Sequence, residues 1–223
     1  MGSRLNVDYR DQRAIFDPDK FTWPVHVIGV GGIGSALLYP LVKLGVSQLH
    51  LWDHDAVEPH NIPAQLIYRP SDVGLNKVEA AMHFLERQEA DCKVVQHEEY
   101  VTSETALEGV VFSCVDSMSS RSDIWEAVKY NPLVPFYLDG RIGGEQLQLL
   151  CVNPSNFDET EFYEKWLFPD SEGMELPCAA RTVIHPAGVL ANLMVAQLTL
   201  FLREEAYKLN LTAHLKAMQF AAA

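Results

Sequence analysis

A glycine-rich hexapeptide at residues 29–34 (GVGGIG) constrains the fold more than any other feature of the chain. It overlaps the end of an apolar, β-branched run at 25–30 and leads into a helical spacing of apolar residues at 33–44. Glycines let a backbone turn tightly against a phosphate, and the helix that follows directs free N–H groups and its positive dipole end at that anion. The hexapeptide therefore predicts a strand–turn–helix unit that binds a nucleotide. Its glycines are Gly29, Gly31, Gly32 and Gly34.

Strand-like and helix-like segments alternate along the rest of the chain. Short apolar runs typical of strands lie at 48–52, 93–97, 110–115, 136–139 and 145–152. Helical spacing occurs at 71–88, where Ser71 or Asp72 would be the cap, at 120–129 and at 186–205, and a shorter amphipathic piece ends at 218. Right-handed crossovers between such strands give a parallel sheet. We expect an α/β fold, with a Rossmann-like, largely parallel sheet flanked by helices and extra β-structure on its C-terminal side.

Composition limits the class of protein. The 223 residues are 48% hydrophobic and 21% charged, which predicts one globular domain over 1–223, with 1–22 as an N-terminal arm. A net charge of −13 argues against general nucleic-acid binding, which needs clustered lysine and arginine. The apolar stretch 187–202 contains Asn192, Gln197 and Thr199, so it indicates a buried helix and no membrane span.

The cysteines give further expectations. None of the four belongs to a C-x-x-C pair, so we expect no structural zinc and no redox dithiol. Free thiols without an export signal indicate the reducing cytoplasm. The four are Cys92, Cys114, Cys151 and Cys178, of which Cys114 and Cys151 fall in apolar strands and are expected in the core.

A carboxylate is correctly placed for a ribose. Asp53 follows the second strand, 19 residues after Gly34, where it can accept hydrogen bonds from ribose hydroxyls. An NAD-dependent oxidoreductase would use the same loop and acid. That alternative leaves Lys77, Asp116 and Arg121 without a role.

Further motifs at the right elements make the chain resemble the ThiF/MoeB/HesA family, the adenylating relatives of ubiquitin-activating enzymes. The resemblance covers about 24–134 and 177–202. Besides the glycine loop, the matching residues are Asp53, Asp55, Val57, Glu58, Asn61, Gln65, Gly74, Lys77, Cys114, Asp116 and Arg121.

The resemblance implies a function and a division of roles. Such an enzyme activates the C-terminal carboxylate of a small ubiquitin-like or sulfur-carrier protein with ATP, forming an acyl-adenylate and pyrophosphate. Asp53 would hold the ribose, Asp116 would bind Mg²⁺ beside the phosphates, and Lys77 would reach the phosphates. Asp55 and Asn61 would shape the loop between ribose and phosphate, while Gln65 and Arg121 fall on further positions of the nucleotide-binding motif. Relatives are commonly homodimers, so a homodimer is expected.

One position departs from the family pattern Asn-x-x-Arg-Gln. Ala64 stands where the family has a phosphate-facing arginine, a residue type that can contribute roughly 10³–10⁵ in the rate of phosphoryl transfer. Arg69 could replace it, as could Arg10 or Arg13 from an N-terminal arm lent across a dimer. The other interpretation is a non-catalytic nucleotide-binding scaffold of the same family.

Cys178 has a different setting from the other cysteines. It precedes Ala-Ala and lies three residues before Arg181, in a segment that resembles the activating enzyme of the ubiquitin-fold modifier. That resemblance implies a thioester nucleophile, whose thiolate a nearby cation or helix N-terminus would favour. A member of the family that stops at the adenylate would not need it.

Overall fold

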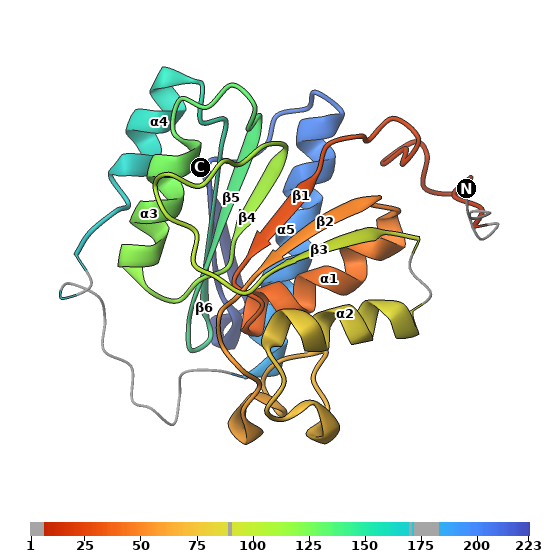
Figure 1. The fold of residues 1–223 in the computed structure, drawn as a ribbon. Coiled ribbons are helices and arrows are strands. Elements are labelled where there is room, and N and C mark those ends of the chain that lie inside the picture. The colour runs from red at the N-terminus through yellow and green to blue at the C-terminus, as the bar shows by residue number, and fades with distance from the viewer. Residues whose placement is uncertain (1–6, 89–90, 170, 172–182) are drawn as a thin grey trace.

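An eight-stranded sheet runs through the computed structural model, which describes residues 7–88, 91–169, 171 and 183–223 (Figure 1). The strand order is β3-β2-β1-β4-β5-β6-β7-β8. The strands are β1 Val25–Ile28, β2 Gln48–Trp52, β3 Lys93–His97, β4 Val110–Ser113, β5 Phe136–Gly143, β6 Gln146–Val152, β7 Asn210–His214 and β8 Gln219–Ala222. The α-helices are α1 Gly32–Leu44, α2 Lys77–Arg87, α3 Met118–Val128, α4 Phe157–Glu164 and α5 Ile184–Leu202.

The sheet has a parallel part and an antiparallel part. The first five strands in sheet order, β3-β2-β1-β4-β5, pair in parallel. Val25 of β1, for example, lies opposite Leu49 of β2 and Val110 of β4. From β5 onward each neighbour is antiparallel. The predicted fold class is confirmed, including the extra β-structure at the C-terminal side.

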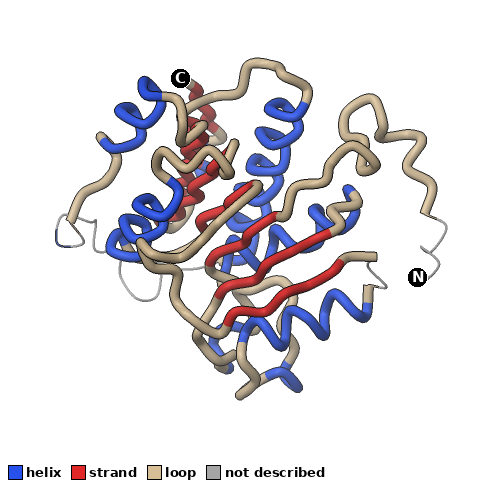
Figure 2. Tube along the Cα trace, turned by 45° about the horizontal axis from the view of Figure 1, so that its top comes forward, coloured by secondary structure: helices blue, strands red, loops and turns tan. Residues whose placement is uncertain are grey.

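Two apolar cores lie on the two faces of the sheet. Leu37 of α1 and Leu190 of α5 belong to the first core, which also takes residues from α2. Trp125 of α3 and Tyr163 of α4 belong to the second. Figures 1 and 2 show the consequence: α1, α2 and α5 cover one face, while α3 and α4 lie on the other face, where α4 packs against β6.

One predicted helix begins later than expected, and the structure has one helix that was not predicted. The helix expected from 71 begins at Lys77, and its cap is Asn76, whose side chain accepts a hydrogen bond from the N–H of Val78. A separate 3₁₀ turn, Pro70–Asp72, precedes it, because Gly74 at φ +92° breaks the helical path. Helix α4, whose cap is the side chain of Asn156, lies in a segment where the sequence analysis placed neither a strand nor a helix.

The amphipathic piece that ends at 218 forms strand β7 and a 3₁₀ turn, Leu215–Ala217, and strand β8 follows it. In β7, Ala213 is buried and its neighbours are more exposed, which is the period-two alternation of a strand with one covered face. Pairing with β6 decides between helix and strand here.

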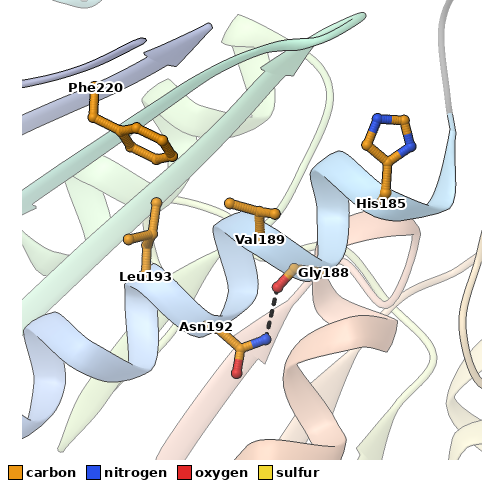
Figure 3. A pocket seen from close by; sticks show the side chains of 6 residues that line it. All are labelled: His185, Gly188, Val189, Asn192, Leu193 and Phe220. Atoms are coloured by element: carbon orange, nitrogen blue, oxygen red, sulfur yellow. Dashed lines mark hydrogen bonds between the residues drawn. The ribbon is translucent and has the colours of Figure 1, made fainter. Parts of the chain in front are cut away.

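Helix α5 is long and apolar enough to cross a membrane by length and composition. In the fold it packs against α1, β5 and β6, with Ala191, Met194 and Leu198 fully buried, as expected of a core helix. Its other side forms, with β8, a shallow hollow of about 560 Å³ (Figure 3). The residues that line the hollow are His185, Gly188, Val189, Asn192, Leu193 and Phe220.

The N-terminal arm lies against the C-terminal end of α1. Gln12 donates to the carbonyl of Leu44 at 2.7 Å, and Phe16 and Phe21 are buried in the first core. The arm is therefore at the opposite end of α1 from the glycine loop (Figure 1).

Three histidines lie on β1, β2 and β3, on the face of these strands that no described helix covers. His26 is 3% exposed and accepts a hydrogen bond from the indole N–H of Trp52 at 3.1 Å. His50 lies over it and contacts His97 through ring nitrogens 3.1 Å apart. Burial, with the neighbouring His50 and His97, lowers the pKa of His26 from 6.5 to about 3.

Acid is therefore expected to destabilise the protein well above the pH at which carboxylates protonate. The unfolded chain takes up a proton on His26 near pH 6.5 while the folded chain does so near 3, so stability falls as the pH drops between those values. Between pH 7 and pH 4 this group alone costs about 3 kcal/mol. Urea unfolding across that range should show a flatter profile for His26→Gln, whose amide oxygen can still accept from Trp52. An unchanged profile would contradict the expectation.

Candidate nucleotide site

The glycine turn between β1 and α1 is held by close backbone contacts. Gly29 has φ +87°, and a Cβ there would lie 2.8 Å from the carbonyl oxygen of Cys114. A Cβ on Gly34 would lie 1.9 Å from the carbonyl oxygen of Gly29. Gly31 differs, because its Cβ would meet only Gln65, at 3.9 Å. The absent side chain at Gly31 thus leaves open space above the turn, and no side chain caps the first N–H groups of α1. This cradle fits a phosphate.

Gly34→Ala should therefore disrupt the turn. We expect about 3 kcal/mol of destabilisation, the upper end for overpacking, because the opposing atom is backbone and cannot rotate away. The matched control is Gly188→Ala in α5, where a Cβ meets nothing within 4 Å and should stabilise the helix by about 0.5–1 kcal/mol. Thermal unfolding measures both, and equal effects would refute the steric argument.

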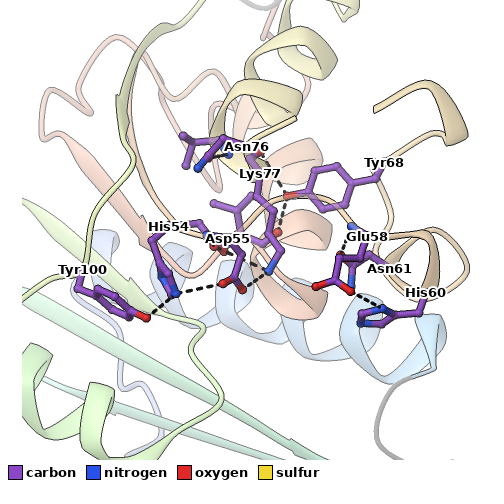
Figure 4. Close-up of polar contacts among 12 residues, drawn as sticks. His54, Asp55, Glu58, His60, Asn61, Tyr68, Asn76, Lys77 and Tyr100 are labelled. Carbon is purple, nitrogen blue, oxygen red and sulfur yellow. Dashed lines mark hydrogen bonds and ion pairs between the residues drawn. The ribbon is translucent and has the colours of Figure 1, made fainter. Parts of the chain in front are cut away.

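Lys77 and Asp55 meet beside this turn (Figure 4), and Asp53 lies next to them. One oxygen of Asp53 accepts from the N–H of Val30 at 2.8 Å, and the other accepts from the N–H of Asp55 at 2.9 Å. Lys77 donates to Asp55 at 2.7 Å and lies 3.8 Å from Asp53. The Lys77 side chain is only 9% exposed, so it is not a solvated lysine on the helix surface.

The two carboxylates have different electrostatics. Burial raises the pKa of Asp53 above its ordinary value, although Lys77 and the N–H groups of Asp55 and Val30 offset part of that effect. Partial burial acts in the same direction on Asp55, but the hydrogen bond and the charge of Lys77, together with His54, outweigh it and hold the pKa of Asp55 below its ordinary value. The ammonium of Lys77 is thus held by one exposed, ionised partner that a nucleotide can displace.

The Asn61–Gln65 segment forms one wall of the site. Asn61 is buried, and its side chain accepts from the N–H of Glu58 at 2.8 Å, which holds the turn of this loop. Gln65 is 9% exposed, and its carbonyl oxygen has no hydrogen-bond partner. A buried oxygen without a partner is costly unless a ligand or water satisfies it. Ala64 is also buried, at 8% exposure.

Tyr68 is a residue of the site that the sequence analysis missed. Its buried hydroxyl donates to the carbonyl oxygen of Val30 at 2.7 Å and lies 3.4 Å from that of Lys77. Burial raises its pKa, so it stays a neutral donor. It ties the glycine turn to the start of α2, and only its position in the segment YRPSD could have drawn attention to it.

Asp116 and Arg121 occupy different environments. Asp116 is exposed in the loop after β4, at the same sheet edge as the glycine turn. Arg121 is 4% exposed, and its donors are taken by Asp139 and by backbone carbonyls. The geometry thus assigns Arg121 to the loop that carries Asp116 and not to the nucleotide itself. Beside this loop lies a hollow of about 370 Å³, lined by Met118, Ser119, Ser122, Leu167, Phe168 and Pro169.

Three arginines were candidates to replace the family arginine that is absent at Ala64. Arg69 is exposed and precedes the 3₁₀ turn Pro70–Asp72. Arg13 pairs with Asp19 at 2.8 Å in the arm, and Arg10 pairs with Asp8. A role for Arg10 or Arg13 would require a second subunit, so all three assignments stay predictions.

The described cysteines are free and poorly nucleophilic. Cys114 and Cys151 are buried, as predicted, and burial raises the pKa of both thiols. Burial raises the pKa of Cys92 to about 12. Cys178 lies outside the described residues.

The two loop histidines, His54 and His60, contact different partners. His60 pairs with Glu58 at 3.3 Å, whereas His54 stacks on Tyr100 and lies 3.0 Å from Asp55. Within the described part of the chain, Asp53, His54 and Asp55 are close enough to share a cation. The ammonium of Lys77 already supplies positive charge there.

Comparison with known proteins identifies the family of the chain. The ThiF family model matches residues 20–221. Ubiquitin-like modifier-activating enzyme 5 of Gallus gallus is 29% identical over 213 residues, covering 81% of this chain and 51% of the relative. The adenylyltransferase and sulfurtransferase MOCS3 of Aedes aegypti is 31% identical over 146 residues, covering 58% of this chain and 33% of the relative. The chain thus spans about half the length of the first of these relatives.

Solved structures share the fold. PaaA superposes with a TM-score of 0.72 at 18% identity, covering 100% of this chain and 85% of that one. Escherichia coli MccB with ATP gives a TM-score of 0.70 at 18% identity, covering 92% of this chain and 65% of that one.

Proposed function

The chain belongs to the ThiF family, and from that premise we propose that it adenylates the C-terminal carboxylate of a small ubiquitin-like or sulfur-carrier protein with Mg·ATP. The observation that carries the proposal is the buried ammonium of Lys77 beside an open glycine cradle. A nicotinamide-dependent oxidoreductase needs the cradle and Asp53 but has no use for that cation.

The residues suit the charge problem of this reaction. A carboxylate oxygen attacks the α-phosphorus of ATP, the bond to the β-phosphate oxygen breaks, and pyrophosphate leaves with its electron pair. The attacking and leaving groups are both anionic, so catalysis is mainly charge neutralisation and positioning. The N-terminus of α1 would hold phosphate oxygens, Asp53 would hold the ribose, and Lys77 would move from Asp55 to the phosphates. Magnesium, held by Asp116, would neutralise phosphate charge.

A catalytically silent scaffold is the second candidate, and Ala64 favours it. The site lacks the arginine that the family pattern has at this position, and the alanine is buried, so no cation can come from it. Binding of ATP without exchange of pyrophosphate would support this alternative.

The test is ATP–pyrophosphate exchange with radiolabelled pyrophosphate and candidate acceptors that end in Gly-Gly. Exchange that depends on the acceptor and is lost in Asp116→Asn supports adenylation. Arg13→Ala and Arg69→Ala, measured in parallel, identify the replacement cation. Tight ATP binding with no exchange for any acceptor would reject the enzymatic proposal.

A thioester step at Cys178 is a finer part of the same proposal. Its support is indirect: the pKa values of the three other thiols are raised by burial, so none of them is suited to attack an adenylate. A thiol-labile adduct between the chain and the acceptor should form after adenylation and be absent in Cys178→Ala. An adduct that persists in that variant would exclude the step.

We also propose a homodimer. The hollow between α5 and β8 is apolar, and Phe220 and Met218 beside it are 62% and 80% exposed. Light scattering should give twice the chain mass, and Phe220→Asp should lower it if this face is the interface. A monomeric mass for the wild type would contradict the dimer.

A further inference from the structure

Asp139 is a fully buried carboxylate in β5 with two arginine partners. Arg121 donates to one of its oxygens at 2.9 Å. Arg141 donates to the other at 2.8 Å, and the hydroxyl of Tyr163 donates to that same oxygen at 3.0 Å. Asp139 is 0% exposed, and Arg121 and Arg141 are also buried or nearly so. We call these four residues the Asp139 cluster.

Arg121 connects this cluster to the loop after β4. Beyond Asp139, its guanidinium donates to the carbonyl oxygens of Val115 and Ser117. These two residues flank Asp116. The arginine therefore holds the peptide group that joins Val115 to Asp116 and the one that follows Ser117, so it fixes the loop on both sides of the exposed Asp116.

Arg141 connects the same carboxylate to the opposite wall of the neighbouring hollow. It donates to the carbonyl oxygen of Trp166 at 2.8 Å. The next residues, 167–169, line the hollow of about 370 Å³ together with the start of α3. Asp139 thus holds two segments that are separated by about 50 residues in the chain.

Stability alone does not account for such a cluster. Buried ion pairs are often no more stabilising than well-packed apolar side chains, whereas they fix geometry because each hydrogen bond is directional. Here the Nε of Arg121 donates to Asp139, and its two terminal nitrogens donate to backbone carbonyl oxygens.

We propose that Asp139 is a positioning residue that, through Arg121, holds Asp116 where it receives the magnesium ion of Mg·ATP. This inference rests on the proposed function. Arg141, the other arginine of the cluster, orients residues 167–169 at the hollow and has no part in metal binding.

Calorimetry with Mg·ATP, and with ATP in EDTA, tests the proposal on the full chain. Arg121→Lys keeps a cation for Asp139 but cannot span Asp139 and two carbonyls at once. It should weaken Mg·ATP binding by about tenfold, as loss of an outer-shell partner does, and leave metal-free ATP binding unchanged. The matched control is Arg141→Lys, which should keep Mg·ATP binding within about twofold.

A double-mutant cycle separates positioning from general damage. If Arg121 acts through Asp116, then Arg121→Lys should add nothing to the loss already caused by Asp116→Asn. Additive losses, or an equal loss of metal-free ATP binding in Arg121→Lys, would overturn the proposal. Should Arg121→Lys not fold, Asp139→Asn, which leaves Arg121 without its anchor, takes its place in the cycle.

Hydrogen exchange gives a readout that does not need nucleotide. Amide protons at 115–119 should exchange faster in Arg121→Lys than in Arg141→Lys, and those at 166–169 should show the reverse. This result would support the positioning role even if no acceptor promoted pyrophosphate exchange, so the two proposals can fail separately. Equal exchange in both variants would refute it.

Discussion

Replacing Lys77 with alanine should reduce ATP–pyrophosphate exchange by about 100-fold or more. The ammonium is nearly buried at the edge of the glycine cradle, and one preorganised donor to a developing phosphate charge is typically worth 10²–10³ in rate. The same change leaves Asp53 and Asp55 beside the phosphates without a cation between them. The second effect should weaken ATP binding as well.

Two controls make the Lys77 result specific. Lys20→Ala removes an 85% exposed lysine from the arm and should leave exchange unchanged. Lys77→Arg keeps the charge and should retain part of the activity. If Lys77→Ala exchanges pyrophosphate as the wild type does, the lysine serves only to pair with Asp55, and the proposed route for charge neutralisation is wrong.

The parallel half of the fold could be predicted because its signals are local. The glycine turn after β1 and the apolar runs of β2 and β4 each identify their element without reference to the others. The end of the chain could not be predicted in that way. Residues 208–222 alternate weakly, and it is pairing with β6, a non-local contact, that makes them strands.

The residues of the candidate site also fall into those that the sequence could predict and those that only the structure reveals. The sequence motifs pointed to Asp53 and Lys77 as parts of a nucleotide site, and the structure brings the two side chains within 3.8 Å of each other. The sequence could not reveal that Arg121 of α3 faces inward, because its partner Asp139 lies 18 residues further along the chain, on strand β5. The role of Tyr68 was likewise hidden, because its partner is the backbone of Val30.

Asp139→Ala should destabilise the fold by about 3–5 kcal/mol, the range for removing one partner of a buried ion pair. Burial opposes ionisation of Asp139, but Arg121 and Arg141 outweigh it and hold its pKa below the ordinary 3.8. The carboxylate is therefore charged at neutral pH, and its removal leaves two buried guanidinium groups without a counter-charge. Wild type should lose this stabilisation only as the pH falls below that value. Urea unfolding at pH 7 measures the difference.

Matched variants identify the cause of that loss. Asp19→Ala removes a half-exposed aspartate that also pairs with an arginine, and it should cost less than about 1 kcal/mol. Replacing Asp139, Arg121 and Arg141 together with leucine, leucine and methionine should recover much of the stability, because no charge is then left unpaired. The triple variant should still bind Mg·ATP poorly, since the carbonyl oxygens of Val115 and Ser117 have lost their donor. Recovery of both stability and Mg·ATP binding would show that packing alone orients Asp116.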